Sequence, residues 1–483
     1  MKALSFHQNV VSRCLNSDGF LWPSSPVYPC SPCAQSWIVK PMRISFSLVS
    51  GKCRAVSRAT RCASEVSQTN ARVDDLELED CGQESEAENV APFRIFVSTG
   101  DVMGDIHGAN LVKELLKQAQ GTRRRVEVYA LGGQRMRTAG ATLIGDNTGL
   151  SSIGLLEALP LIVPSLLLQI TVRRFLDDHP PHVLVLIDYP GVNIPFGQYV
   201  KQKFGCKIIY YIPPNEWLWN TSRTKSIVSI SDIILAVYPG EAEYYARAGA
   251  NVKLVGHPLI DTVKGINRNE ARQRLGVNTD DIVIALVPAS RSQELRHVWP
   301  TIASAAGKLL KALVEIRGGP HGVHFIIPAV LRDQRHVIEK ECEDNSFFQN
   351  SIIFNGDPHE VLAAADVAIT KSGSTNLEMA LYKVPQVVVY KIDNLTAWIA
   401  RKLFGFSVKN ISLVNLILDS QVVPEYIQEA ADAENIMQAT LKLLPGMDTQ
   451  ERSRVLQGYE QLRVVLGEPG VVERVARQIL DCL

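Results

Sequence analysis

The pattern of hydrophobic and polar positions changes near residue 92. From there, short apolar runs alternate with longer amphipathic segments, which is the order expected for buried strands and the helices that cover them. A helix is expected near 106–118, and strands are expected at 93–98, 126–131, 183–187, 207–211, 233–237 and 253–255. This repetition predicts a parallel sheet with helices on both faces.

The pattern then starts again. Strands are expected at 281–287, 324–328, 351–354, 367–370 and 386–390, and helices at 299–314, 359–365, 450–466 and 471–480. The sequence therefore predicts an α/β chain of two doubly wound, Rossmann-like domains that face a cleft. We expect these domains at 92–265 and 266–410, followed by C-terminal helices at 411–483. Ligands of such sheets bind beyond the carboxyl ends of the strands, so the cleft is the expected site.

Composition separates the first ninety residues from this body. The 483 residues hold 50 Lys and Arg against 50 Asp and Glu, which gives no electrostatic reason to expect nucleic-acid binding. Residues 1–64, however, hold eight Lys or Arg, one acid and twelve Ser, which is typical of an organelle transit peptide. We expect import into the mitochondrion, with the chloroplast as the alternative; a disordered basic tail is the structural alternative. Residues 65–91 are expected to form an extended acidic linker.

Two apolar stretches of the body, Ala158–Ile170 and Trp398–Phe406, suit a membrane surface or lipid chains, although core burial is the simpler interpretation of each. The first is too short to span a bilayer comfortably and contains Pro160 and Pro164. The body has three scattered cysteines, which do not make a disulfide framework, so we expect a reducing compartment.

The first candidate segment joins the first strand to the first helix. Gly100 and Gly104 allow close approach of the backbone to a ligand, and Asp101 and Asp105 add carboxylates beside the start of the helix. The glycine spacing does not match a dinucleotide-binding fingerprint. A tight turn capped by either aspartate is the structural alternative.

The second candidate is Asp188, which follows a buried strand directly. A carboxylate at that end of a strand lies at the sheet edge that faces the cleft, so it could accept a proton from an attacking hydroxyl. An aspartate that caps a helix or orders a loop is the alternative.

The third candidate segment opens a helix of the second domain with Ser372, Gly373, Ser374 and Thr375. Hydroxyls and free N–H groups at that place suit a diphosphate, and Glu378 could accept both hydroxyls of a ribose. Helix capping by Ser374 or Thr375 is the alternative.

Arg291 follows the first strand of the second domain, where it could neutralise a pyrophosphate; a plain surface arginine is the alternative. The sequence contains no zinc motif, no P-loop and no Asp-x-Asp in these segments. The simplest expectation is a reaction without metal or cofactor.

Taken in this order, the segments resemble the lipid-A-disaccharide synthase family of glycosyltransferases over residues 93–480. The resemblance rests on the order and spacing of the pieces rather than on any one of them. They are Gly104–Ala109, Gly132–Met136, Ile187–Pro190 with Asn193, Gly256-His257, Ser290-Arg291, Ser372–Ser374 with Glu378, and Ser412–Leu416.

This resemblance implies a GT-B fold and transfer of 2,3-diacylglucosamine from UDP to the 6-hydroxyl of 2,3-diacylglucosamine 1-phosphate (lipid X), without a metal. It also implies a peripheral membrane protein that can form a homodimer. Asp188 matches the essential carboxylate of the family and Arg291 its phosphate-contacting arginine. Further matches are Asp105 in the first turn, the nucleotide turn Ser372–Ser374 with Glu378, and Asn415 beside the nucleotide.

Four positions depart from the family pattern. Asp101 stands where a glutamate is usual, Met103 replaces a serine, and Gly191 replaces a second aspartate. Ala289 replaces the glycine that usually precedes Ser290-Arg291. Two alternatives stay open, the second of them because of Met103 and Gly191. One is another UDP-sugar transferase or epimerase of GT-B fold, and the other is a relative that binds a nucleotide or lipid without catalysis.

Overall fold

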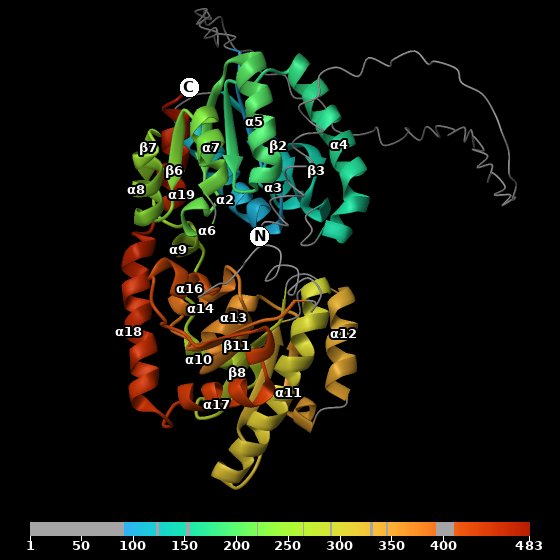
Figure 1. Ribbon diagram of the computed structural model, residues 1–483, viewed down its shortest axis with the longest axis vertical. Helices are drawn as coiled ribbons and strands as arrows, with labels where there is room; N and C mark the ends of the chain where they lie inside the picture. The colour runs from blue at the N-terminus through green and yellow to red at the C-terminus, as the bar shows by residue number, and fades with distance from the viewer. Residues whose placement is uncertain are drawn as a thin grey trace, which may run out of the picture. The chain divides into compact units, whose positions relative to one another are not determined.

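The computed structural model describes residues 91–121, 125–150, 155–219, 221–263, 265–289, 292–328, 332–343, 346–392 and 410–483 (Figure 1). The predicted transit peptide, nearly all of the acidic linker, Arg291 and the apolar run 398–406 lie outside the described residues.

The first half contains the expected parallel sheet, with seven strands in the order β3-β2-β1-β4-β5-β6-β7. One strand, β3, was not predicted from the sequence, because it is short, lies at the sheet edge and contains Gly145. The strands are β1 (Phe93–Ser98), β2 (Val126–Gly132), β3 (Thr142–Asp146), β4 (Val183–Ile187), β5 (Lys207–Tyr211), β6 (Ile233–Ala236) and β7 (Val252–Leu254).

Helices cover both faces of this sheet, because alternate residues of each strand point to opposite sides. Val97 of β1 packs with Leu111 of α2, whereas Phe96 packs with Val172 of α4 and Phe196 of α5. The helices are α2 (Val102–Gly121), α3 (Gln134–Thr138), α4 (Leu155–Asp178), α5 (Pro190–Phe204), α6 (Glu216–Trp219), α7 (Thr224–Ile230), α8 (Pro239–Arg247) and α9 (Leu259–Thr262), with short 3-10 turns at Thr148–Leu150 and Thr221–Arg223.

The second half contains a parallel sheet of six strands in the order β10-β9-β8-β11-β12-β13. Its strands are β8 (Ile282–Val287), β9 (Val323–Pro328), β10 (Ser351–Phe354), β11 (Val367–Lys371), β12 (Gln386–Tyr390) and β13 (Glu425–Ile427). The short strand β13 pairs with β12, so the sheet extends past the boundary expected at residue 410.

Eight helices of the described residues belong to the second half. They are α10 (Arg268–Leu275), α11 (Ser292–Arg317), α12 (Arg332–Glu343), α13 (Pro358–Ala364), α14 (Thr375–Leu381), α16 (Leu413–Ile417), α17 (Ala433–Leu443) and α18 (Thr449–Leu466), with 3-10 turns at Ser346–Asn350 and Gln428–Ala430. None of the helices in the described part of the chain has the length and apolar character needed to cross a membrane.

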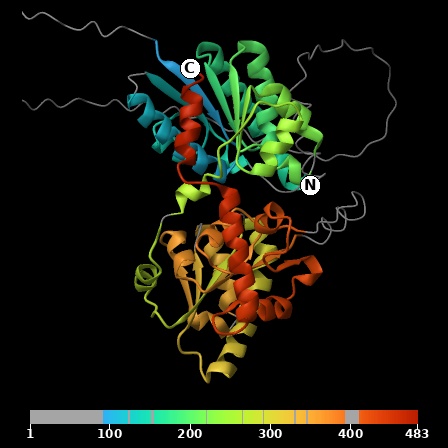
Figure 2. The same ribbon diagram turned by 90° about the vertical axis from the view of Figure 1, so that its left-hand side faces the viewer.

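The last helix, α19 (Val471–Leu480), belongs to the first half rather than the second (Figure 2). Arg474 donates to the carbonyl of Val255 at 2.9 Å, and Gln118 of α2 donates to the carbonyl of Glu473 at 3.1 Å. The region 411–483 is therefore shared between the two halves instead of forming a separate helical unit.

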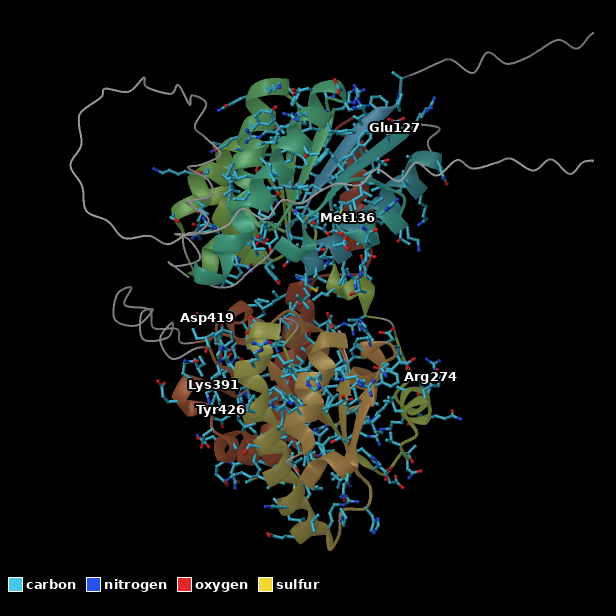
Figure 3. The ribbon with its side chains drawn as sticks, turned by 90° about the vertical axis from the view of Figure 1, so that its right-hand side faces the viewer. Glu127, Met136, Arg274, Lys391, Asp419 and Tyr426 are labelled. Atoms are coloured by element: carbon cyan, nitrogen blue, oxygen red, sulfur yellow. The ribbon has the colours of Figure 1, made fainter. Side chains whose placement is uncertain are left out.

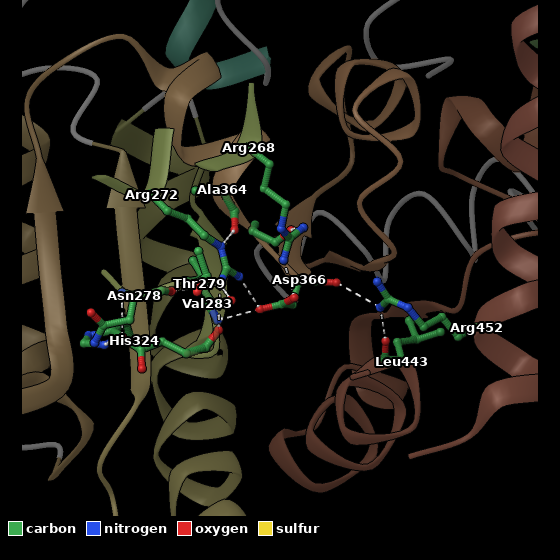
Figure 4. Close-up of polar contacts among 12 residues, drawn as sticks. Arg268, Arg272, Asn278, Thr279, Val283, His324, Ala364, Asp366, Leu443 and Arg452 are labelled. Carbon is green, nitrogen blue, oxygen red and sulfur yellow. Dashed lines mark hydrogen bonds and ion pairs between the residues drawn. The ribbon is translucent and has the colours of Figure 1, made fainter. Parts of the chain in front are cut away.

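A buried ionic network fixes the amino end of β11 (Figure 4). The carboxylate of Asp366 accepts from the guanidinium of Arg272 and from the backbone N–H of Val283, both at 2.8 Å. Arg268 pairs with the other carboxylate oxygen, and Arg452 of α18 donates to the Asp366 carbonyl at 3.0 Å. The network joins α10, β8 and α18 at the sheet edge opposite to the one where ligands bind.

The strand order of each sheet reverses at one point, and the candidate residues lie there. In the first sheet the reversal falls between β1 and β4, whose carboxyl ends lead to Asp101 and Asp188. In the second sheet it falls between β8 and β11, and β11 leads to Ser372. Crevices at such reversals are where open α/β sheets bind ligands. The cleft between the two sheets stays a prediction.

Candidate active site

The turn after β1 and the turn after β4 contact each other in the first half. A Cβ atom on Gly100 would lie 1.9 Å from the ring of Tyr189, so only glycine fits between the two turns. Asp101 follows Gly100, and its carboxylate accepts the N–H of Gly104 at 2.7 Å, which caps the first turn of α2. The structure therefore brings Gly100, Asp101 and Gly104 together beside the turn that carries Asp188.

The Asp188 turn has a strained backbone. Asp188 and Tyr189 both adopt left-handed conformations, with φ of 45° and 46°, which non-glycine residues rarely do. Asn193 holds this conformation: its buried amide donates to the carbonyls of Asp188 at 2.8 Å and Ile187 at 3.0 Å. Tyr210 donates to the same Asp188 carbonyl at 2.8 Å. Strain of this kind persists where surrounding bonds enforce it, and it gathers at functional sites.

The surroundings of the Asp188 carboxyl group raise its pKa, which suits a general base. Its side chain remains accessible to solvent, yet it is crowded by protein. This partial desolvation and the negative charge of Asp101 raise its pKa to about 7, against a smaller opposing effect of the Tyr189 N–H. Near neutral pH the group is therefore partly ionised and still basic enough to take a proton.

A second perturbed carboxyl group, Glu241, was not singled out in the sequence. It is fully buried at the start of α8 and accepts the N–H of Val237 at 2.8 Å. Burial raises its pKa to about 8, and the charge of Asp188 adds to the shift. The sequence offers no signal for it, because a glutamate in the first turn of a helix is ordinary.

The carboxylate of Asp105, in the first turn of α2, forms hydrogen bonds with the backbone at the start of α3. It is buried, and its carboxylate accepts the N–H groups of Gly133 at 2.9 Å and of Arg135 and Met136 at 3.2 Å. These bonds fix the start of α3 against α2, and the side chain of Met136 in α3 is buried in the core of the first half (Figure 3). The geometry gives Asp105 a positioning role; direct contact with a substrate stays a prediction.

Hydrogen bonds to neighbouring segments hold the turn after β11 in the second half. The Ser372 hydroxyl donates to the carbonyl of Ile411 at 2.7 Å, and the N–H of Gly373 donates to the Asn376 side chain at 2.9 Å. Asn376 is fully buried and pairs with Gln386 at 2.9 Å. Sequence reasoning missed Asn376, because its burial is visible only in three dimensions.

Three other predicted residues of this segment have side chains available to a ligand. Ser374, Thr375 and Glu378 are half-buried, and in the described part of the chain their side chains accept or donate no hydrogen bond. Ser374 is the residue before α14, but its hydroxyl does not cap the helix. Burial raises the pKa of the Glu378 carboxyl, against the opposing charge of His359.

Asn415 is a positioning residue in this structure. It is fully buried, donates to the carbonyl of Val423 at 2.8 Å, and accepts the N–H groups of Val422 at 2.8 Å and Val423 at 2.9 Å. Its amide also donates to Glu425, which accepts the N–H of Ile411 at 2.7 Å. Asn415 therefore orders the segment that receives the Ser372 hydroxyl, and its own hydrogen-bonding groups are engaged within the protein.

A buried ion pair joins the end of β11 to the first turn of α11, each next in sequence to a segment that was expected to bind phosphate. The ammonium of Lys371, the last residue of β11, lies 2.8 Å from the carboxylate of Glu294 in the first turn of α11. Both side chains are mostly buried. Arg291 lies outside the described residues, three positions before Glu294. Lys371 directly precedes Ser372, the first residue of the predicted nucleotide turn, and it was not singled out from the sequence.

The departures from the family pattern can also be placed. Met103 is half-buried in the first turn of α2, and Gly191 is buried in the first turn of α5. Within the described ranges, no three His, Cys, Asp or Glu side chains are grouped so that they could hold a metal ion.

Solved structures share this fold at low sequence identity. A UDP-GlcNAc 2-epimerase from Neisseria meningitidis bound to UDP-GlcNAc is similar with a TM-score of 0.55 and 12% identity, over 80% of this chain and all of that one. A UDP-N-acetylglucosamine 2-epimerase from Listeria monocytogenes gives a TM-score of 0.53 and 13% identity, over 80% and 95%. At such identities the likeness is one of fold, which confirms the expected GT-B arrangement of two wound domains.

Sequence relatives are more specific. A lipid-A-disaccharide synthase from Gloeothece citriformis is 43% identical over 392 residues, which span 80% of this chain and 99% of the relative. The synthase from Synechocystis is 40% identical over 393 residues, spanning 80% and 97%. The family model described as lipid-A-disaccharide synthetase matches residues 95–467, which include every candidate residue above and all of both sheets except the first two residues of β1. The chain belongs to the lipid-A-disaccharide synthase family.

Proposed function

We propose that this chain transfers 2,3-diacylglucosamine from UDP to the 6-hydroxyl of lipid X, giving the β-1,6-linked disaccharide 1-phosphate of lipid A biosynthesis and UDP. The observation that carries the proposal is the family match over residues 95–467. The position of Asp188 supports it, because a solvent-accessible carboxyl with a pKa of about 7 lies where the strand order of the first sheet reverses.

In the proposed reaction Asp188 is the general base. Its carboxylate takes the proton of the acceptor 6-hydroxyl while that oxygen attacks the anomeric carbon of the donor sugar. The bond from the anomeric carbon to the β-phosphate oxygen breaks, and UDP leaves with its electron pair. Attack from the side opposite to UDP inverts the configuration, which gives the β linkage. No metal or cofactor takes part.

The second half is proposed to bind the UDP portion. The hydroxyls of Ser374 and Thr375 are available for phosphate oxygens, and the Glu378 carboxylate suits the two ribose hydroxyls. Arg291 and Lys371 would supply positive charge beside the diphosphate.

Turnover with defined substrates tests the proposal. Residues 91–483, incubated with UDP-2,3-diacylglucosamine and lipid X without metal, should release UDP and a disaccharide phosphate. Asp188→Asn should lower kcat by about 10²- to 10⁴-fold while UDP binding persists. The matched control is Asp178→Asn, an exposed aspartate at the end of α4, which should leave kcat unchanged.

The departures at Met103 and Gly191 motivate the alternative of a relative that binds its ligands without transfer. The double variant Asp101→Glu, Met103→Ser separates the two cases. If neither this variant nor the wild type forms product, although both bind UDP, the transferase proposal is wrong. Formation of an epimerised UDP-sugar would instead support the epimerase alternative.

We also propose that the protein works at a membrane surface. Three large apolar side chains on α4 are exposed at helical spacing: Val163, Leu167 and Ile170. Arg174 follows them on the same helix, is exposed and could meet anionic head groups. Both proposed substrates carry acyl chains, so access to them requires such a surface.

Two further proposals concern the whole chain. Residues 1–64 are proposed to direct import into the mitochondrion, with the chloroplast as the alternative; a fluorescent reporter fused to 1–64 should enter one organelle, and deletion of 1–64 should abolish import. A homodimer follows from the family resemblance, and light scattering of the purified chain tests it.

A further inference from the structure

Hydrogen bonds fix the backbone of Asp188 on both sides. Its N–H donates to the carbonyl of Ile212 at 3.1 Å, and its own carbonyl accepts from Asn193 and from Tyr210, each at 2.8 Å. Ile212 is itself left-handed, with φ of 53°, as are Asp188 and Tyr189. Such strain persists only where surrounding contacts enforce it, so whatever holds Asn193 in place helps to decide where the Asp188 carboxylate lies.

The side-chain amide of Asn193 has one orientation that satisfies its surroundings. The residue is fully buried, and one end of its amide faces the carbonyl oxygens of Ser98 at 3.4 Å, Ile187 at 3.0 Å and Asp188 at 2.8 Å. Carbonyl oxygens only accept hydrogen bonds, so the NH₂ group must lie at this end and Oδ1 at the other. The amide is therefore held only if a donor meets Oδ1.

The hydroxyl of Ser98 is such a donor. Ser98 is the last residue of β1 and lies on the same face of the strand as Phe96, whose ring packs against Phe196 of α5. The Ser98 hydroxyl donates to Asn193 Oδ1 at 2.8 Å, and neither residue has exposed surface. This bond joins the end of β1 to the first turns of α5, at the point where the strand order of the sheet reverses.

We propose that Ser98 is a positioning residue for the transfer reaction: its hydroxyl fixes the Asn193 amide, and the amide fixes the left-handed turn that presents the Asp188 carboxylate. The inference rests on the proposed function, in which Asp188 is the general base. Without the hydroxyl, Oδ1 of Asn193 would be buried without this donor, and the amide would no longer be held against the turn. A base displaced in this way loses its alignment with the acceptor hydroxyl.

A double-mutant cycle tests this role. Ser98→Ala should lower kcat by about tenfold, because the general base loses its fixed geometry. The KM for lipid X and the affinity for UDP should stay within about twofold of the wild type, since the buried Ser98 contacts neither ligand. In the Asp188→Asn background no carboxylate remains to be positioned, so Ser98→Ala should there change kcat by less than about twofold.

The control and the contradicting outcomes are distinct. Thr224→Val removes a buried hydroxyl of α7, which lies 2.7 Å from the hydroxyl of Tyr244, and should leave kcat unchanged. An unchanged kcat in Ser98→Ala would overturn the proposal, as would an equal loss in the wild-type and Asp188→Asn backgrounds, which indicates a general effect on the fold. If Ser98→Ala does not fold, Ser98→Cys takes its place, because a thiol fills the site but donates only weakly. Failure of the proposed function looks different, because the wild type itself would then release no UDP.

Discussion

The ionisation of Asp188 sets the expected pH dependence of the reaction. Its pKa is raised to about 7, and a general base acts only when ionised. The value of kcat/KM should therefore be full above this pKa and fall about tenfold for each pH unit below it. A pH profile of the wild type measures the midpoint; an acidic limb centred near pH 4 would mean that the raised pKa does not govern turnover.

Asp101 provides a direct test of the cause of this shift. Its charge raises the pKa of Asp188, so Asp101→Asn should move the acidic midpoint of kcat/KM to lower pH. The asparagine oxygen can still accept the N–H of Gly104, so the turn should keep its structure. Asp178→Asn serves as the control and should leave the midpoint in place. An unchanged midpoint in Asp101→Asn would contradict the electrostatic explanation.

Lys371 is expected to contribute to UDP binding. Its ammonium pairs with Glu294 at 2.8 Å, and the phosphates of UDP would compete for the same positive charge. Lys371→Met should therefore weaken UDP binding by about tenfold, measured by calorimetry. Glu294→Gln should not weaken it, because that change frees the ammonium.

The matched control for Lys371 is Lys383→Met. Lys383 forms an exposed pair with Glu460, and its loss should leave UDP affinity unchanged. Equal affinities of the wild type and Lys371→Met would show that Lys371 serves only the ion pair.

At the scale of elements, the apolar runs located most strands correctly, because a strand buried on both faces must be apolar throughout. The failures have physical reasons. Strand β13 has three residues, Glu425–Ile427, and its pairing with β12 is set by tertiary contacts rather than by its own pattern. Helix α2 starts at Val102, earlier than the expected 106, because Asp101 caps it.

The candidate residues differ in how much the sequence could say about them. Asp188 was found because it directly follows an apolar strand, and that placement fixes it at the sheet edge. The sequence could not reveal that the side chains of Asp105 and Asn415 form hydrogen bonds within the protein, because their partners, such as Gly133 and Val422, lie in other loops. Lys371 likewise needs the fold, because Glu294 is distant in the chain.

The exposed face of α4 is expected to bind membranes. Leu167→Gln together with Val163→Gln replaces two exposed apolar side chains without changing charge. Burial of one such side chain in lipid stabilises binding by about 1.5–3 kcal/mol, so the double variant should lose most of its co-sedimentation with anionic lipid vesicles. Val464→Gln is the control, because Val464 is 81% exposed on α18. Equal loss in both variants would contradict a specific role for α4.

At the scale of the whole molecule, the last two helices connect the two halves, because one packs on each half. Helix α18 packs with the second half, and α19 returns to the first, where Asp261 accepts the N–H groups of Gly470 at 2.7 Å and Val472 at 2.9 Å. The core of the first half therefore includes residues from the end of the chain, and it cannot be complete until α19 has been made.

This arrangement predicts which half a change in α19 destabilises. Ile479 is fully buried on α19, so Ile479→Ala should lower the free energy of unfolding by about 2–4 kcal/mol. Hydrogen exchange should speed up in the peptides of α2 and β1, whereas peptides of β8 and β11 should keep their protection. Val464→Ala, at an exposed position of α18, should change neither measurement. Faster exchange confined to the second half would contradict the assignment of α19 to the first.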